Sequence, residues 1–252
     1  NADGCYLYSR HSSPSKLYLG EALAAMEATQ TSTVSASGMG AITAVLMQLC
    51  NAGDHVVSSR TIYGGTYAFL KNFAPKFGIR TSFVDIINLE AIEHAISDKT
   101  TVLYCESVSN PLLEVADLRA LSKIAKKHNI QLVVDNTFSP LSISPKVLGA
   151  DIVIHSLTKF INGSSDTIGG VVCGSQELID NLRDVNNGAA MLLGASMDSL
   201  RAASILKNLR TLHIRMKQHS YNALYLAKKF EEDGIKTVYP GLESHPSYTV
   251  FK

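Results

Sequence analysis

The sequence predicts an α/β fold with a mainly parallel sheet flanked by helices. Short apolar runs rich in β-branched residues alternate along the chain with amphipathic helical patterns, as expected of successive βαβ units. The chain has 252 residues, enough to bury a large core. It contains no repeat of roughly 20 to 50 residues and no low-complexity tract, which excludes solenoids and disordered arrays.

Seven segments have the composition and length of strands inside a sheet. The connection between the last two is about a dozen residues rich in Gly and Ser, barely long enough for a parallel crossover that carries a helix. One antiparallel strand in an otherwise parallel sheet is therefore expected. The predicted strands are residues 32–36, 54–59, 79–85, 101–107, 130–135, 151–155 and 169–174.

Helical patterns fill the intervals between these strands. One example is the helix after Asp117, a candidate N-cap, in which four apolar residues are expected to share one face. These four are Leu118, Leu121, Ile124 and Ala125.

The stretch from Met197 to Glu232 predicts one long helix or two consecutive helices, closed by Gly234 as a C-cap. The following residues, 235–252, begin like a strand and read as the start of a second layer. The apolar positions that mark the helical stretch are Leu200, Ala203, Leu206, Leu209, Leu212, Met216, Ala223, Ala227 and Phe230.

Composition excludes several classes of partner. The net charge is +1, so no overall field favours nucleic acid or an anionic membrane, and a small-molecule partner is expected. No apolar run reaches the length of a membrane span, and no signal peptide is recognisable. The four cysteines lack CxxC spacing, which predicts buried free thiols, no metal site and a reducing, cytoplasmic location.

The segment after the first predicted strand contains a turn with Gly38 and Gly40 that opens a helix. Free amides of Gly38, Met39 and Gly40 there can bind an anion, although the turn can equally be a plain connection. A dinucleotide fingerprint is disfavoured, because Thr43 stands where the third glycine belongs and no acidic residue closes the next strand.

Two further residues stand at the carboxyl ends of predicted strands, where open α/β sheets bind ligands. Asp135 ends one strand and is either a turn cap or a partly desolvated carboxylate in need of a cation. Lys159 follows a neighbouring strand and is either a surface lysine or a nucleophile toward carbonyl groups. An amine, a carboxylate and a phosphate cradle together match the needs of pyridoxal 5'-phosphate (PLP).

These residues lie in segments that resemble the trans-sulfuration family of PLP enzymes. The family includes methionine γ-lyase, cystathionine γ-lyase and γ-synthase, and O-acetylhomoserine sulfhydrylase. The resemblance keeps the family's order and spacing across nearly the whole chain. The matching segments are "YSRHSSPS" (8–15), "SASGMGAI" (35–42), "YGGT" (63–66), "ESVSNPLLEVAD" (106–117), "VVDNTFSP" (133–140) and "HSLTKFINGSSD" (155–166).

The resemblance implies a role for each site residue. Lys159 would hold PLP as a Schiff base, and Asp135 would pair with the pyridinium nitrogen. Ser156, Thr158 and the amides of Gly38 and Met39 would bind the phosphate. Tyr63 would stack on the ring and assist the leaving group, and Asn110 would lie near the phenolic oxygen. Tyr8 and Arg10 would reach the phosphate of a neighbouring subunit, while His155 is expected only to pack or to form hydrogen bonds.

The family also implies the type I fold of PLP-dependent transferases and a domain plan. The expected parts are an arm (1–15), a PLP-binding α/β domain (16–195), linking helices (196–234) and the truncated start of a small C-terminal α/β domain (235–252). The arginine for the substrate carboxylate would belong to the rest of that domain. The expected assembly is a dimer with shared active sites or a tetramer.

The expected activity is a carbon–sulfur lyase reaction on sulfur amino acids. Two segments, "MLLGASM" and "YPGLESHP", are most similar to methionine γ-lyases, whereas Gly65 stands where bacterial methionine γ-lyases carry Cys. O-acetylhomoserine sulfhydrylase, cystathionine γ-lyase or γ-synthase, and a PLP-binding subunit without turnover remain as alternatives.

Overall fold

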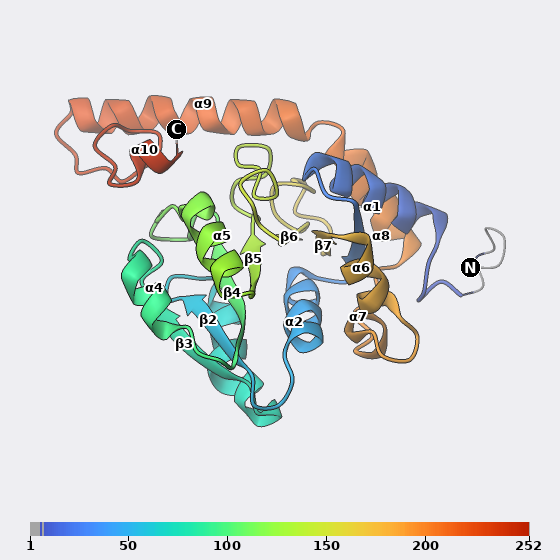
Figure 1. The fold of residues 1–252 in the computed structure, drawn as a ribbon. Helices are drawn as coiled ribbons and strands as arrows, with labels where there is room; N and C mark the ends of the chain where they lie inside the picture. Colours follow the sequence, from blue (N-terminus) through green and yellow to red (C-terminus); the bar gives the residue numbers. More distant parts are fainter. Residues whose placement is uncertain (1–5, 7, 252) are drawn as a thin grey trace.

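The computed structural model describes residue 6 and residues 8–251. Its centre is a sheet of seven strands in the order β1-β7-β6-β5-β4-β2-β3 (Figure 1). The strands are β1 (Thr31–Ser35), β2 (His55–Ser59), β3 (Arg80–Val84), β4 (Thr100–Glu106), β5 (Gln131–Asp135), β6 (Ile152–Ser156) and β7 (Gly170–Gly174).

All seven predicted strands are present, and each boundary lies within one residue of its expected position. Strand β7 runs antiparallel to both of its neighbours, β1 and β6, while every other pair in the sheet is parallel. The prediction of a single antiparallel strand is confirmed. The short Gly- and Ser-rich connection after β6 turns back along the sheet instead of crossing it.

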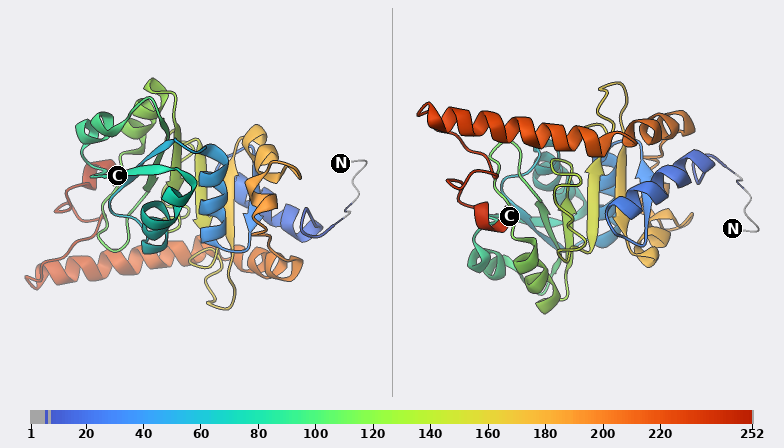
Figure 2. Two further views of the ribbon diagram at one scale, coloured as in Figure 1. Left: turned by 90° about the horizontal axis from the view of Figure 1, so that it is seen from below. Right: turned by 90° about the horizontal axis from the view of Figure 1, so that it is seen from above.

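Helices cover both faces of the sheet, which gives three layers (Figure 2). Alternate residues of each strand join two separate clusters, so that Leu103 packs on one side and Val102 and Tyr104 on the other. The first face carries α1 (Pro14–Met26), α4 (Leu89–Ala95), α5 (Leu118–Lys127) and α8 (Ser199–Leu209). The second carries α2 (Gly38–Leu49), α3 (Gly64–Ala68), η1 (Phe69–Phe73), η2 (Ala74–Phe77), α6 (Gln176–Arg183) and α7 (Ala189–Leu192).

Helix α5 has the predicted cap and the predicted buried face. The carboxylate of Asp117 accepts a hydrogen bond from the amide of Ala120 at 3.0 Å, which satisfies one free donor of the first turn. All four apolar residues predicted to share a face are buried.

The stretch from Met197 to Glu232 forms two helices, α8 and α9 (Leu212–Glu232), so the second of the two expected arrangements is the one observed (Figure 1). The predicted apolar face of α8 is confirmed for Leu206 and Leu209, which pack against the core, and is wrong for Leu200, which is 83% exposed, and for the exposed Ala203. Ala202 and Ile205 fill the core instead, because the helix packs on α1 through the neighbouring face. Gly234 ends α9 with a φ of 73°, as predicted for a C-cap.

No strand follows α9 in the described part of the chain, contrary to the expectation for residues 235–252. The amide of Ile235 still bonds to the carbonyl of Phe230 at the helix end, and turns follow. The described chain closes with the short helix α10 (Tyr248–Phe251). The earlier part of the predicted arm, residues 1–5 and 7, lies outside the described residues.

Three cysteines, Cys50, Cys105 and Cys173, are free and buried, as predicted. Burial raises the pKa of the Cys105 and Cys173 thiols well above the ordinary value. The same expectation for Cys5 falls outside the described residues. Among the helices that the structure describes, none combines the length and apolar character needed to cross a membrane.

Candidate active site

The carboxyl ends of β4, β5 and β6 lie side by side and end in three polar residues. Glu106 is directly opposite Asp135 in the parallel register, and Ser156 ends the next strand. Strand alternation points all three side chains to the sheet face that α2 covers. The residues that close these strands therefore meet at the beginning of α2.

The first turn of α2 provides two free amide donors beside Ser156. The side chain of Ser37 caps the helix by accepting from the amide of Gly40 at 3.0 Å, so Gly40 does not offer the free N–H that the sequence predicted. A Cβ atom on Gly38 would lie 2.7 Å from the Cβ of Ser156, a separation that real atoms do not tolerate. Glycine here lets the amides of Gly38 and Met39 approach the Ser156 hydroxyl, and these groups are called the cradle below.

Asp135 is 6% exposed and is tied to the cradle by Thr137. The amide of Thr137 donates to the Asp135 carboxylate at 2.9 Å, and the Thr137 hydroxyl accepts from the amide of Ser156 at 2.7 Å. Burial raises the pKa of Asp135, although the bonds from Thr137 oppose that shift. Among the described residues, no lysine or arginine forms an ion pair with Asp135.

Glu106 organises two predicted ring contacts, a role that sequence reasoning did not assign to it. Its carboxylate accepts from the amide of Tyr63 at 2.6 Å and from the amide of Asn110 at 3.3 Å. Burial, and then the nearby Asp135, raise the pKa of Glu106 from 4.5 to about 8. The available signal was its position at a strand end four residues before Asn110 of "NP".

The raised pKa of Glu106 predicts a pH dependence of stability. The folded state holds this proton more tightly than the unfolded chain, so the stabilisation is complete below about pH 4.5 and is lost as the pH rises through about 8. Relative to Glu106→Gln, the wild-type free energy of unfolding should fall by roughly 2 kcal/mol or more over that interval. Denaturant titrations at several pH values measure this difference.

The matched control is Glu90→Gln, which changes an exposed carboxylate on α4. The difference in free energy of unfolding between Glu90→Gln and wild type should stay nearly constant with pH. A Glu106→Gln curve parallel to wild type would show that Glu106 does not carry the tightly held proton.

Tyr63 lies over the beginning of α2 and is 53% exposed. A Cβ atom on Gly65 would lie 2.6 Å from the Tyr63 ring and 3.1 Å from the sulfur of Met39. Any larger residue at position 65 therefore requires the Tyr63 ring to move. Gly65 thus lies close to both the Tyr63 ring and the Met39 side chain. The ring-stacking role that the resemblance implies for Tyr63 stays a prediction.

Lys159 follows β6 by three residues and has an exposed side chain. Its backbone is held in a turn, because its amide bonds to the carbonyl of Ser156 at 3.3 Å and its carbonyl accepts from Gly163 at 2.8 Å. No hydrogen bond of its Nζ atom to another described residue is recorded. The hydroxyl of Thr158 already donates to the carbonyl of Gly169 and accepts from its amide.

Tyr8 and Arg10 lie together ahead of α1. The Arg10 guanidinium stands 5.3 Å from the centre of the Tyr8 ring and donates to the carbonyl of Met191 at 3.2 Å. Arg10 makes no recorded hydrogen bond to the cradle of its own chain. The structure does not bring these two residues into the site formed by the other predicted residues.

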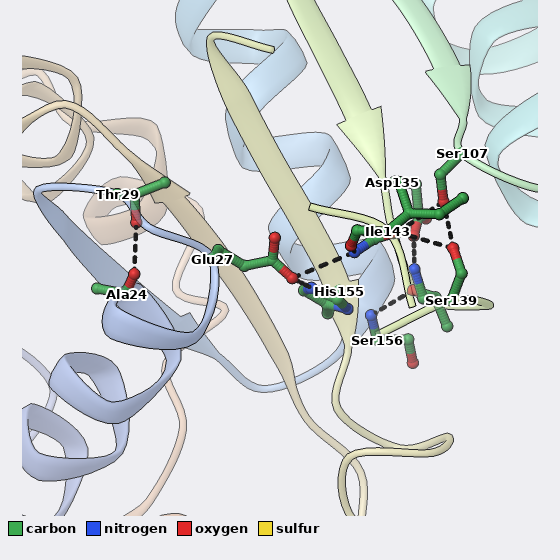
Figure 3. A network of polar contacts seen from close by, with 11 residues as sticks. Ala24, Glu27, Thr29, Ser107, Asp135, Ser139, Ile143, His155 and Ser156 are labelled. Atoms are coloured by element: carbon green, nitrogen blue, oxygen red, sulfur yellow. Dashed lines mark hydrogen bonds and ion pairs between the residues drawn. The ribbon is translucent and has the colours of Figure 1, made fainter. Parts of the chain in front are cut away.

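His155 points to the opposite face of the sheet, where it contacts the end of α1 (Figure 3). Its Nε2 atom lies 2.6 Å from the carboxylate of Glu27, which also accepts from Asn136 at 3.2 Å. All three side chains are buried. The expected hydrogen-bonding role of His155 is confirmed, and this network joins α1 to the sheet behind the site.

The model of one protein family, described as "Cys/Met metabolism PLP-dependent enzyme", matches residues 1–252. The chain belongs to this family. Pyridoxal phosphate is thus the cofactor to test against the geometry. The match covers every site residue discussed above.

Individual relatives agree with this membership. A methionine gamma-lyase of Arabidopsis thaliana is 46% identical over 98% of the chain, and a probable cystathionine gamma-synthase of Herpetosiphon aurantiacus is 39% identical over 97%. The chain covers 56% of the former and 76% of the latter.

A crystal structure of cystathionine gamma-lyase from Lactobacillus plantarum complexed with L-serine superposes with a TM-score of 0.93 at 29% identity. That comparison covers 99% of this chain and 65% of the other.

The residues present fit pyridoxal phosphate. The free amides of Gly38 and Met39 and the Ser156 hydroxyl can donate to a phosphate, since glycine at position 38 keeps this space open. The buried carboxylate of Asp135 has no ion pair with a lysine or arginine among the described residues. A protonated ring nitrogen can supply that positive charge. Lys159 offers an amine at the same edge of the sheet.

Proposed function

We propose that the chain is the PLP-binding part of a carbon–sulfur lyase that acts on sulfur amino acids, most specifically a methionine γ-lyase. One observation carries the proposal. The buried Asp135 ends β5, the cradle includes Ser156 at the end of β6, and Lys159 follows β6 by three residues, so a carboxylate, free amides and an amine come from two adjacent strand ends. Membership of the Cys/Met metabolism family of PLP-dependent enzymes supports the same function.

Each residue then has a defined task toward the cofactor. PLP, when bound, supplies an aldehyde that forms a Schiff base with an amine and a ring that withdraws electrons. Lys159 would supply that amine, Asp135 would keep the ring nitrogen protonated, and Asn110 would help to hold the phenolic oxygen. The cradle and Thr158 would bind the phosphate, and the Thr158 hydroxyl would give up its bond to the carbonyl of Gly169 to do so.

Two residues of this chain move protons in the proposed reaction. The Nζ atom of Lys159, as a free amine, would accept and return protons on the substrate carbons. The Tyr63 hydroxyl would donate a proton to the departing sulfur, and the ring that carries it is exposed. With water as the second reactant, methionine gives methanethiol, ammonia and 2-oxobutanoate.

The same site can serve two related outcomes. An activated homoserine with sulfide or a thiol would give replacement at the γ-carbon, as in an O-acetylhomoserine sulfhydrylase or a cystathionine γ-synthase. Cystathionine would be cleaved by elimination. Gly65 favours none of these outcomes, because it places no reactive side chain beside the Tyr63 ring.

The proposed active unit is a homo-oligomer. It is at least a dimer with shared active sites, and the complete assembly is a tetramer. Arg10 supports this, since it makes no recorded bond to the cradle of its own chain and suits a bidentate contact with the phosphate of a neighbour. The buried free thiols are compatible with a cytoplasmic location.

The test compares three reactions of the PLP-loaded protein. We expect 2-oxobutanoate and methanethiol from methionine at a higher kcat/KM than for cystathionine cleavage or for O-acetylhomoserine with sulfide. A higher value for either competitor would move the assignment to that activity. No reaction with any of them would contradict the lyase proposal.

A further inference from the structure

Lys16 is a buried lysine in the first turn of α1, at 7% exposure. Its ammonium group donates to the carbonyl oxygens of Ser9 at 2.5 Å and Arg10 at 3.1 Å, and to the Ser196 hydroxyl at 3.3 Å. Burial lowers the pKa of Lys16, and the nearby Arg183 adds to this effect. The three acceptors compensate for an otherwise unfavourable buried charge.

The position is a costly one for a cation. The helix dipole disfavours positive charge in the first turn of a helix. An apolar side chain would fill the same space without the free-energy cost of removing a charge from water. The contacts of Lys16 instead converge on the backbone at Ser9 and Arg10, which indicates that the charge serves to hold that backbone.

Ser196 completes this connection on the other side. Its hydroxyl donates to the same carbonyl of Arg10 at 2.9 Å while it accepts from Lys16. The preceding residue, Ala195, accepts from the amide of Ala36 at 2.7 Å, and a Cβ atom on Gly40 would lie 2.8 Å from its own Cβ. The segment that binds Arg10 therefore also packs against the beginning of α2, where the cradle lies.

We propose that Lys16 is a positioning residue that, with Ser196, fixes the backbone of Arg10 to the segment bracing the cradle. Residues 8–13, the described part of the arm ahead of α1, are thereby held at a set position relative to the cofactor site of their own subunit. This inference rests on the proposed function, in which Arg10 contacts the phosphate in a neighbouring subunit. The Lys16–Ser196 pair then connects two cofactor sites of one dimer.

The first experiment measures release of the arm directly. Trypsin cleavage after Arg10 in the PLP-loaded protein is followed by mass spectrometry for wild type, Lys16→Met and Ser196→Ala. We expect both variants to be cleaved about tenfold faster or more, because each loses bonds that hold the Arg10 carbonyl. Lys123→Met, which removes an exposed lysine of α5, should match wild type.

The second experiment separates positioning from general stability. Lys16→Met should raise the apparent Kd for PLP several-fold while kcat at saturating PLP stays near wild type. In a protein that already carries Arg10→Met, adding Lys16→Met should not raise the apparent Kd for PLP further. Both substitutions act through the same contact, that of Arg10 with the phosphate.

Two results would overturn the proposal. One is cleavage after Arg10 at the wild-type rate in both Ser196→Ala and Lys16→Met, and Ser196→Ala alone decides this if Lys16→Met does not fold. The other is a loss of PLP affinity on Lys16→Met that is equally large in the wild-type and in the Arg10→Met protein. Failure of the proposed function would instead appear as no PLP binding by wild type, and the same cleavage comparison on the protein without PLP would then still test the contacts of Lys16 and Ser196.

Discussion

Lys159→Ala should lose the visible absorption of protein-bound cofactor and at least about 10³-fold in lyase activity. The variant removes the only amine that we place at the cradle, and with it the group that moves protons on the substrate. The fold should be retained, because the side chain is exposed and the turn at this position is held by backbone atoms. Absorption spectra and 2-oxobutanoate assays measure the two effects.

Lys123→Ala is the matched control for this experiment. It removes another exposed lysine, on α5, and should leave both spectrum and activity unchanged. Retention of the cofactor absorption and of near wild-type activity by Lys159→Ala would exclude Lys159 as the Schiff-base residue.

Asp135→Asn should reduce lyase activity by about 10²-fold or more while the protein still folds. An asparagine oxygen can accept the same bond from the amide of Thr137, so the connection to Ser156 is kept. The neutral side chain, however, cannot hold a proton on the ring nitrogen, and the ring withdraws electrons less strongly. Steady-state kinetics with saturating PLP measure the loss.

Asp117→Asn provides the control, since asparagine is as good an N-cap as aspartate and this residue lies at the start of α5. Its activity should equal that of wild type. An Asp135→Asn protein with wild-type kcat would contradict the role of the carboxylate.

The sheet was predictable because strand signals are local. Runs such as residues 130–135 carry their own pattern, and the short connection after β6 determined the direction of β7. Helix α1 was not predicted, and the expected strand after Gly234 is absent from the described residues. Both are places where packing and turns override a short local pattern.

The site was predictable only as a set of strand ends. Family resemblance supplied the roles of Lys159 and Asp135, and the structure places Asp135 next to the cradle. The contacts of Glu106 with Tyr63, and of Lys16 with Arg10 and Ser196, join backbone or side-chain atoms of separate segments. Such pairings leave no periodic signal in a single sequence.

Borohydride reduction of the PLP-loaded protein, followed by digestion and mass spectrometry, tests the central claim most directly. The reduction converts a Schiff base into a stable bond and marks the lysine that formed it. The account predicts one pyridoxyl group per chain, on the peptide that contains Lys159. A label on another lysine, or no label in a protein that retains bound PLP, would contradict it.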